Sequence, residues 1–384
     1  MTDNIKLPPI AGKVAWLCSY TPEELIRAAG FLPYRPTIKD EDEAQKSGYL
    51  PGNLCPYVRS AAHKLLQIEE KDLAGVVIAN SCNAMMHLYN MLEQESELSV
   101  FLLDLPRQKN EKARNYFADC LQDMLKFLSG LGQKIEAAKL YKTMTIYHNT
   151  EKIWQQAFKD DPEQGEDKLR ENKFLPTGFI ADRASRQAFT RERWKFNRDL
   201  REAIDRKTRG NKAENFLPNL TNFATRQKYI LTGAQPPPFL SEILTEQGAA
   251  VFHDHCQGYR YWQKNYNEFA AEDSGSSVEA FGEAENLSRL LGRLADIYLQ
   301  KPGCPRFYDL HERQQFYQNL LAACDFTGVI YHNLNFCDFA HYDYLRLKEF
   351  FQSQNLPVLN LASELSSGDQ GQLRTRIEAF LEMA

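Results

Sequence analysis

Three cysteines occupy positions that suit metal or redox chemistry. Cys55, Cys82 and Cys337 each follow a stretch predicted to be a β-strand and precede a helical pattern. Loops that leave the carboxyl ends of parallel strands share one edge of a sheet, so thiols from distant parts of the chain can meet there. Thiolates gathered in this way bind an iron–sulfur cluster or a zinc ion. These positions therefore indicate a metal-dependent or redox function.

The chain contains eight cysteines in all. A large intracellular protein keeps its thiols reduced, so we expect no disulfide framework. Cys120 and Cys324 lie in helical patterns, and we interpret both as small buried apolar side chains. Cys18 ends the first predicted strand and Cys304 lies in Gly-Cys-Pro, so either could approach the three-cysteine site. Ordinary burial is the simpler interpretation of both.

A zinc site is an alternative around Cys256, which lies close to His253 and His255. Side chains alternate between the two faces of a strand, which places the histidines on one face and the cysteine on the other. A single short strand is then a poor source of three ligands for one ion. Zinc is the less favoured interpretation of these residues.

Length and composition indicate a globular protein of two α/β domains, with three as the alternative. Hydrophobic residues make up 43% of the 384 residues and charged residues 25%, as in soluble proteins. The formal net charge of −5 gives no reason to expect nucleic acid as a partner. No apolar run approaches the ~20 residues of a membrane helix, and the N-terminus lacks the features of a signal peptide. We therefore expect a cytoplasmic protein without a membrane partner.

The elements that would position the cysteines alternate between strand and helix. In the first part we predict strands at 13–20, 73–80 and 98–105 and helices at 22–29 and 83–92. In the second part we predict strands at 228–231, 249–254, 328–333 and 357–361 and helices at 239–247, 285–299, 342–354 and 370–383. Apolar strands separated by helices are typical of parallel, doubly wound sheets.

The fold class predicted is therefore α/β, with two Rossmann-like domains joined by a helical segment. We expect an N-terminal domain over 1–108 with two of the three cysteines, and a C-terminal domain over 226–384 with the third. Between them, 109–225 has charged, helical periodicity and no convincing strand. The cysteine site would then lie at the junction of the two domains.

Several motifs in combination resemble one known family. They are Cys18-Ser-Tyr-Thr-Pro-Glu-Glu-Leu-Ile-Arg-Ala-Ala-Gly-Phe-Leu-Pro-Tyr-Arg35, Leu54-Cys-Pro-Tyr-Val-Arg-Ser60, Ser81-Cys-Asn-Ala-Met-Met86, Asp254-His-Cys-Gln-Gly-Tyr-Arg-Tyr261, Tyr298-Leu-Gln-Lys-Pro-Gly-Cys-Pro305, Gly328-Val-Ile-Tyr-His-Asn-Leu-Asn-Phe-Cys337 and Gly371-Gln-Leu-Arg-Thr-Arg-Ile-Glu-Ala-Phe380. The chain resembles the cluster-bearing subunits of 2-hydroxyacyl-CoA dehydratases and the related benzoyl-CoA reductase subunits. The match covers all of the chain except its helical middle.

The resemblance implies one [4Fe–4S] cluster, held between the domains by Cys55, Cys82 and Cys337. Its fourth iron would lack a protein thiolate and stay open to water or a substrate oxygen. The resemblance also implies a CoA thioester substrate, reduced by one electron so that it can lose an unactivated hydroxyl, or reduction of an aromatic ring. The electron would come from a separate ATP-hydrolysing iron–sulfur activator. The partner would be a homologous second subunit or a second copy of this chain.

The sequence agrees with two of these implications. It has no Gly-x-x-x-x-Gly-Lys phosphate loop, so ATP hydrolysis would need another protein. A dry site with few hydrogen bonds would give the cluster a low potential. The apolar neighbours Leu54, Phe336 and Phe339 are compatible with that.

Two residues near the site are candidates for proton transfer. His332 lies in the strand that leads to Cys337, and histidine titrates near neutrality. Glu364 follows the last strand, where the family usually has the acidic pair Glu-x-Asp. A structural role is the alternative for His332, and also for His341 beyond Cys337.

Four arginines in or near the matched motifs are candidates for binding CoA. They are Arg35, Arg59, Arg374 and Arg376. Guanidinium groups near strand ends or a helix start could hold a phosphate or the thioester oxygen. For the last two, helix capping and a surface ion pair are an equally good interpretation.

Ala362-Ser363-Glu364 departs from the family pattern, because one carboxylate is missing and the other is a methylene longer. This departure keeps two alternatives open. One is a stand-alone reductase of a non-CoA small molecule, similar to relatives with a double-cubane cluster on six cysteines. Ala234 occupies one position at which they have an additional cysteine, so a single cubane is expected here. The other is a catalytically silent partner subunit that carries a cluster.

Overall fold

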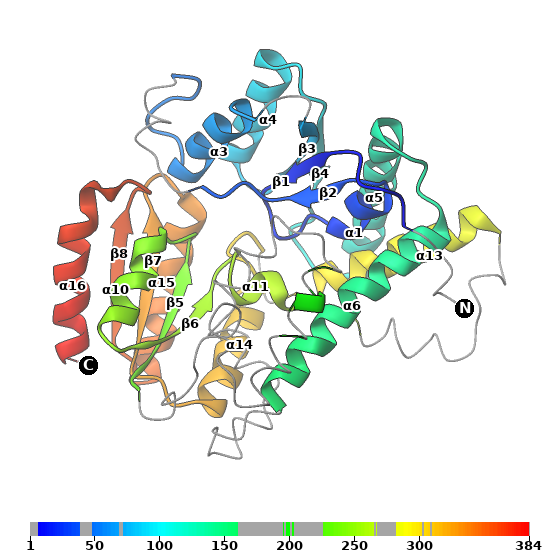
Figure 1. Ribbon diagram of the computed structural model, residues 1–384. Coiled ribbons are helices and arrows are strands. Elements are labelled where there is room, and N and C mark those ends of the chain that lie inside the picture. The colour runs from blue at the N-terminus through cyan, green and yellow to red at the C-terminus, as the bar shows by residue number, and fades with distance from the viewer. Residues whose placement is uncertain are drawn as a thin grey trace.

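Two parallel sheets with helices on both faces make up most of the protein (Figure 1). The computed structural model describes residues 7–38, 48–68, 72–159, 195, 197–199, 202, 226–264, 266, 282–301, 303–307 and 309–383. The predicted α/β class, with two Rossmann-like sheets, is confirmed. None of the helices within these residues is long and apolar enough to cross a membrane.

The first sheet has the strand order β2-β1-β3-β4, with every pair parallel. Its strands are β1 (Lys13–Trp16), β2 (Leu32–Tyr34), β3 (Leu73–Asn80) and β4 (Val100–Asp104), and its helices are α1 (Glu23–Ala28), α3 (Pro56–Leu66), α4 (Asn83–Glu95) and α5 (Glu111–Leu131). Successive strand residues point to opposite faces. Val14 packs with α1 and α5, whereas Ala15 packs with α3 and α4. Both faces are buried, as the apolar strands predict.

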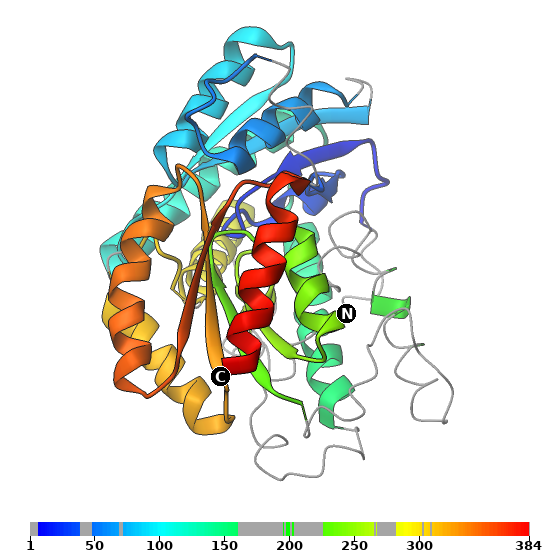
Figure 2. The same ribbon diagram turned by 90° about the vertical axis from the view of Figure 1, so that its left-hand side faces the viewer.

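The second sheet repeats this arrangement in the order β6-β5-β7-β8. Its strands are β5 (Lys228–Gly233), β6 (Ala250–Asp254), β7 (Gly328–Leu334) and β8 (Val358–Ser363), and its helices are α10 (Pro238–Glu246), α14 (Leu310–Ala323), α15 (Asp338–Ser353) and α16 (Gln370–Met383). Figure 2 shows α10 and α16 on one face of this sheet and α14 and α15 on the other. In both sheets the second strand pairs with one side of the first strand and the third strand with its other side. The point between the first and third strands is a switch point, where open α/β sheets bind ligands.

A layer of long helices covers the outer face of the first sheet. It consists of α5, α6 (Ala137–Lys159) and α13 (Glu283–Leu299), and α13 packs against both of the others (Figure 1). Phe117 and Leu121 of α5 also share one apolar core with β1. The predicted helical segment 109–225 thus begins as a layer of the first domain, and most of its later part lies outside the described residues.

Several predicted boundaries shift by a few residues. The strand expected over 13–20 ends at Trp16, and the helix expected over 342–354 already begins at Asp338. The sequence did not predict β2, because this edge strand has three residues and contains Pro33. Gly30 does end α1 as expected, with a φ of +93° that favours glycine.

Candidate metal centre

The three cysteines singled out in the sequence occupy equivalent positions, at the starts of three helices. Cys55 is the N-cap residue of α3, Cys82 of α4 and Cys337 of α15. The first turn of a helix carries backbone N–H groups without intrahelical partners and the positive end of the helix dipole. Such surroundings favour a thiolate over a thiol. All three cysteines therefore have the electrostatic setting of a metal ligand.

The backbone after each cysteine strengthens this effect. The N–H groups of Val58, Met85 and Ala340, each three residues further along, interact with the sulfur and favour the thiolate. For Cys55 and Cys82 this effect opposes a net rise in pKa, caused mainly by the contact with Cys337 and by burial, respectively. None of these contacts has the geometry of a cap hydrogen bond. The lone pairs of the three sulfur atoms thus remain available to bind a metal.

The pKa values show that the three thiols are neighbours. A hydrogen bond between Cys55 and Cys337 lowers the pKa of Cys337 to about 7 and raises that of Cys55 well above its usual range. Burial raises the pKa of Cys82, and the charge of Cys337 adds to the increase. The fold therefore brings these thiols together from three separate loops.

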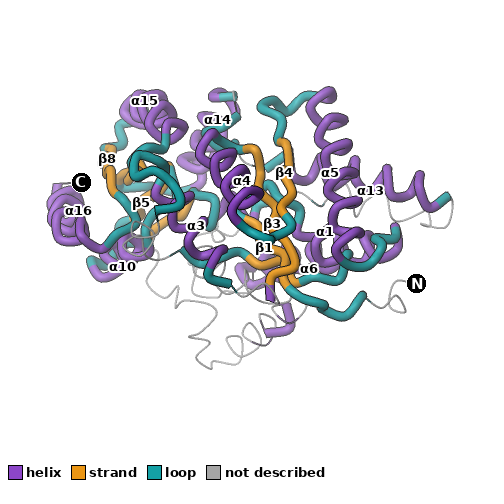
Figure 3. Tube along the Cα trace, turned by 90° about the horizontal axis from the view of Figure 1, so that it is seen from above, coloured by secondary structure: helices purple, strands orange, loops and turns teal. Residues whose placement is uncertain are grey.

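The cysteines lie where the two domains meet. Cys55, Cys82 and Cys337 border one apolar cluster, to which α3 and α4 contribute from the first domain. Leu334 and Leu365 join this cluster from the carboxyl edge of the second sheet. Seen from above, α3 and α4 lie between β3 and the second sheet (Figure 3). The expected position at the domain junction agrees with this packing.

The donor set fits an iron–sulfur cluster, which is typically held by cysteine thiolates in a partly buried site. Among the described side chains, no three His, Cys, Asp or Glu are close enough to hold one metal ion. A cluster places each thiolate on a different iron atom, so its ligands need not converge on a point. The residues that would hold it are Cys55, Cys82 and Cys337.

Two cations that the sequence analysis missed lie beside the cysteines. Arg306, between α13 and α14, donates a 2.7 Å hydrogen bond from Nη1 to Sγ of Cys18. Its charge opposes the rise in the pKa of Cys82 that burial causes, and it helps to lower the pKa of Cys337. Arg107 donates a 3.0 Å hydrogen bond to the carbonyl of Ser81. Arginine is common on protein surfaces, so the one sequence signal was the position of Arg306 directly after the matched Gly-Cys-Pro motif.

The same arginine also connects the site to the two additional cysteines considered above. Arg306 contacts Cys18, and its charge helps to lower the pKa of Cys304 against the effect of burial. Burial raises the pKa of Tyr20 well above its usual range, and Cys304 and Cys18 add to this increase. Cys18 and Cys304 thus lie near the three-cysteine site, grouped around a cation.

Arg59 and Glu364 are brought together by the fold. Arg59 is 6% exposed, lies one turn after Cys55, and has its Nη2 3.7 Å from Oε2 of Glu364. Glu364 follows β8, so the ion pair connects the two domains beside the cysteines. Arg59 and Glu364, which the sequence suggested for separate roles, therefore belong to one site.

His332 is held as a neutral ring. It is fully buried on β7, and burial lowers its pKa to about 4. Its Nε2 is 2.9 Å from Oγ of Ser363, whose hydroxyl in turn lies 2.9 Å from the Glu364 carbonyl. These contacts favour a role in orienting the segment after β8. His341 lies exposed in the first turn of α15.

Arg35 joins the domains at a different point. Its guanidinium is fully buried and donates hydrogen bonds of 3.0 and 3.3 Å to the carbonyl oxygen and Sγ of Cys256. It also donates to the hydroxyl of Tyr57 and lies 5.1 Å from the ring centroid of Trp16. This environment explains the position of Arg35 without a ligand.

Arg374 and Arg376 lie on the surface of α16. Arg374 forms a 2.8 Å ion pair with Glu246 of α10, and Arg376 donates a 2.7 Å hydrogen bond to the carbonyl of Asn360. A surface ion pair was one of the two interpretations of these residues. Both contacts involve solvent-exposed side chains that a ligand could replace at small cost.

The residues considered for zinc have other contacts. The rings of His253 and His255 lie 5.5 Å apart, between centroids. Cys256 instead accepts from Arg35 and donates to Gln235. β6 ends at Asp254, so strand alternation does not apply to His255 and Cys256. The two histidines contact each other, whereas the cysteine has other partners.

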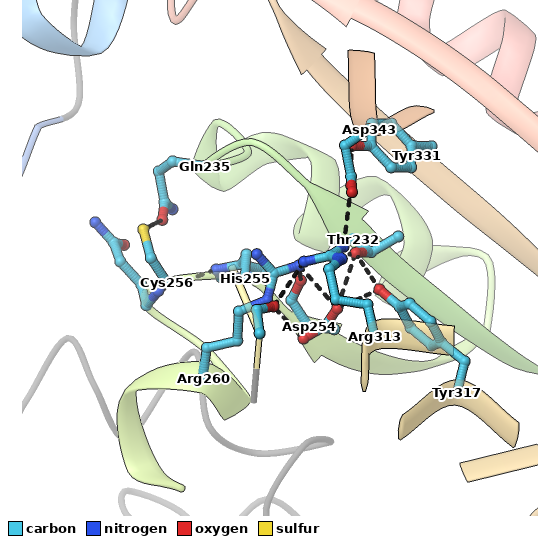
Figure 4. Close-up of polar contacts among 12 residues, drawn as sticks. Thr232, Gln235, Asp254, His255, Cys256, Arg260, Arg313, Tyr317, Tyr331 and Asp343 are labelled. Atoms are coloured by element: carbon cyan, nitrogen blue, oxygen red, sulfur yellow. Dashed lines mark hydrogen bonds and ion pairs between the residues drawn. The ribbon is translucent and has the colours of Figure 1, made fainter. Parts of the chain in front are cut away.

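A buried charge network next to these residues stabilises the second domain (Figure 4). Asp254 receives two hydrogen bonds from Arg260, of 2.8 and 2.9 Å, and others from Thr232 and Tyr317. Arg260 and these other contacts hold the pKa of Asp254 well below its usual range despite complete burial. The sequence motif contained Asp254 and Arg260 but did not show that they pair.

Known proteins provide an independent comparison. The chain matches the family described as 2-hydroxyglutaryl-CoA dehydratase, D-component, over residues 18–384. It is 22% identical to the lactoyl-CoA dehydratase subunit beta of Anaerotignum propionicum, covering 99% of this chain and 94% of the relative. It is 20% identical to the (R)-phenyllactyl-CoA dehydratase beta subunit of Clostridium sporogenes, covering 94% and 89%.

A third relative is the (R)-2-hydroxyglutaryl-CoA dehydratase subunit beta of Acidaminococcus fermentans, 19% identical over 94% of this chain and 90% of the relative. The family match begins after β1 and spans the other seven strands and the positions of Cys55, Cys82 and Cys337. The chain therefore belongs to the 2-hydroxyglutaryl-CoA dehydratase D-component family.

Proposed function

We propose that this chain is the cluster-carrying beta-type subunit of a cytoplasmic 2-hydroxyacyl-CoA dehydratase or a close, benzoyl-CoA reductase-like relative. The observation that carries the proposal is the meeting of three helix N-caps, Cys55, Cys82 and Cys337, at the junction of two parallel sheets. The relatives are beta subunits of CoA dehydratases, which supports a CoA thioester substrate and a second, homologous subunit.

When bound to these cysteines, a [4Fe–4S] cluster would supply one-electron reductive chemistry, with an electron from a separate ATP-hydrolysing activator. The protein contributes the setting. Three helix starts direct positive potential at the thiolates, and the apolar cluster below them keeps water away. Three thiolates leave one cluster corner without a protein ligand, and a substrate oxygen could occupy that position.

In this proposal Glu364 moves a proton at the substrate and Arg59 holds its carboxylate in place. The ion pair fixes Glu364 at the edge of the second sheet, next to the helix that begins at Cys55. His332 acts through Ser363, as a neutral ring that orients the same segment. Arg374 and Arg376, at the start of α16, are the proposed contacts for CoA phosphates, because their present partners are exposed. A CoA contact by Arg35 would require breaking its buried hydrogen bonds.

Iron and sulfide quantitation after anaerobic purification tests the site. We expect about four irons and four sulfides per chain, and loss of most of both in Cys55→Ala, Cys82→Ala and Cys337→Ala. Cys324→Ala is the matched control, because Cys324 is as buried as Cys55 (8% exposed) but packs in the core between α14 and α15. Zinc without sulfide, or iron that survives all three substitutions, would refute the proposal.

The substrate class is tested with the cluster-loaded chain, its homologous partner subunit and an activator. Short-chain, aromatic and acidic 2-hydroxyacyl-CoA thioesters should lose water in an ATP-dependent reaction. Free 2-hydroxy acids should not react, because they lack the thioester carbonyl that accepts the electron.

One observation favours a second candidate. Ala362 stands where the resemblance implies an acidic residue, and it lies exposed on β8, opposite Asn333. Without this carboxylate, the site is compatible with a stand-alone reductase of a non-CoA small molecule, or with a silent subunit that only carries the cluster. The silent subunit would bind four irons yet show no change in its reduced spectrum with any CoA thioester.

A further inference from the structure

Arg306 is a partly buried cation that lies next to thiols. Its Nη1 lies 2.7 Å from Sγ of Cys18, and its Nε is buried without a hydrogen-bond partner. Over the residues that the structure describes, no carboxylate forms an ion pair with it. A thiol is only a weak acceptor, so Cys18 alone is a poor counterpart for a guanidinium, which stays charged at any physiological pH.

A charged group that is partly removed from water and has no counter-charge is costly to a protein. The groups that act electrostatically on Arg306 are the thiols of Cys18, Cys304 and Cys82, which become negative when they lose their protons or bind a metal. The charge of Arg306 acts on Cys82 and Cys337, which come from different domains, as well as on Cys18 and Cys304. Arg306 thus faces the cysteine site from the loop between α13 and α14, outside the three helices that provide the ligands.

A [4Fe–4S] cluster on three thiolates carries net negative charge, and one-electron reduction adds another. A nearby cation stabilises the reduced form more than the oxidised form, because attraction scales with charge. Reduction potentials of such clusters respond to net charge and hydrogen bonds near the sulfurs. A positive group at this position would therefore raise the reduction potential of the cluster. The apolar surroundings have the opposite effect.

We propose that Arg306 is the charge-compensating residue of the iron–sulfur site and that it raises the reduction potential of the cluster. The inference rests on the proposed function, since it requires a cluster on Cys55, Cys82 and Cys337. It makes Arg306 a positioning residue that acts through the cluster, without touching the substrate. The loop after α13 then sets the potential at which an activator can load the site.

A redox titration followed by electron paramagnetic resonance tests this role in the full-length, cluster-loaded chain. In Arg306→Gln we expect a more negative midpoint, such that the ratio of reduced to oxidised cluster at the wild-type midpoint falls about tenfold or more, which is ~59 mV for a one-electron couple. Arg306→Lys keeps the charge and should recover most of this loss. The matched control is Arg114→Gln, which makes the same change in net charge at an exposed pair with Asp296 and should leave the midpoint unchanged.

The outcomes are distinguishable. A wild-type chain without iron and sulfide would refute the proposed function itself. A wild-type chain with a cluster, together with an unchanged midpoint in Arg306→Gln, would overturn only the role of Arg306. If Arg306→Gln holds no iron, the lysine variant decides: recovery of iron supports charge compensation, and continued loss overturns it.

Discussion

The guanidinium of Arg59 lies 3.7 Å from the carboxylate of Glu364, and this ion pair connects the helix that begins at Cys55 to the segment that follows β8. Arg59 is almost completely buried and Glu364 is about one quarter exposed, at 6% and 24%. The pair therefore spans the domain junction at the cysteine site. Substitutions at these two residues can therefore distinguish an effect on kcat from an effect on the free energy of unfolding.

Glu364→Gln removes the charge and the transferable proton but keeps the shape of the side chain. If Glu364 moves a proton in the reaction, kcat should fall roughly 10²- to 10⁴-fold, with iron and sulfide content unchanged. Measured kcat in the reconstituted enzyme, alongside iron content, checks this. A wild-type kcat in Glu364→Gln would show that the carboxylate is only structural.

A double-mutant cycle of Arg59→Gln and Glu364→Gln measures the ion pair itself. At 3.7 Å and with one partner partly exposed, we expect a coupling free energy of about 0.5–1 kcal/mol in urea unfolding. The single change at buried Arg59 should cost more than the one at Glu364. Additive effects of the two changes would mean that the contact contributes nothing to stability.

His332 makes stability depend on pH. Burial lowers its pKa from the usual 6.5 to about 4. Between these two pH values His332 is protonated in the unfolded chain but neutral in the folded chain. The stabilisation is complete above pH 6.5 and is lost as the pH falls through this window, by about 2 kcal/mol at pH 5. His332→Asn should remove this loss.

Urea unfolding of both proteins at pH 7 and pH 5 provides the measurement. The quantity compared is the difference between the two pH values within each protein, because the substitution also breaks the hydrogen bond to Ser363. Other groups, such as His148, contribute equally to both proteins and cancel. An identical pH difference in the two would contradict the assignment.

The Asp254–Arg260 pair should be sensitive to removal of either partner. Both side chains are at most 4% exposed and bonded at 2.8 Å, so Asp254→Asn leaves a buried guanidinium without its counter-charge. We expect a loss of about 3–5 kcal/mol in the free energy of unfolding. Asp296→Asn, which breaks the exposed pair with Arg114, should cost less than about 1 kcal/mol. Similar losses in the two variants would argue against the buried network.

Gly233 and Gly248 provide a matched pair of glycine substitutions. Both have positive φ, of +101° and +80°. A Cβ at Gly233 would lie 2.3 Å from the carbonyl oxygen of His332, whereas one at Gly248 would meet no atom within 4 Å. Gly248→Ala should cost about 1 kcal/mol for its backbone alone. Gly233→Ala should cost several kcal/mol more, measured by the urea midpoint, and equal costs would contradict the close approach of β5 and β7.

Local sequence patterns were sufficient for most of the architecture. Apolar runs and the residues that end helices depend on neighbours along the chain, so β3 and α16 were predicted with their observed boundaries. The edge strand β2 was missed because three residues that include a proline carry no readable pattern. The layer formed by α5 with α13 was also missed, because it joins segments far apart in sequence.

The sequence by itself determined which cysteines to consider, since Cys55, Cys82 and Cys337 each stand between a strand and a helix. Only the tertiary structure decided which charged side chains connect the two domains at and around them. The pairs Arg59–Glu364, Arg35–Cys256 and Arg306–Cys18 join residues between 221 and 305 positions apart. Such contacts arise from the packing of one domain on the other, and no local pattern encodes them. The chemistry at the three cysteines thus follows from the sequence, and its electrostatic environment from the fold.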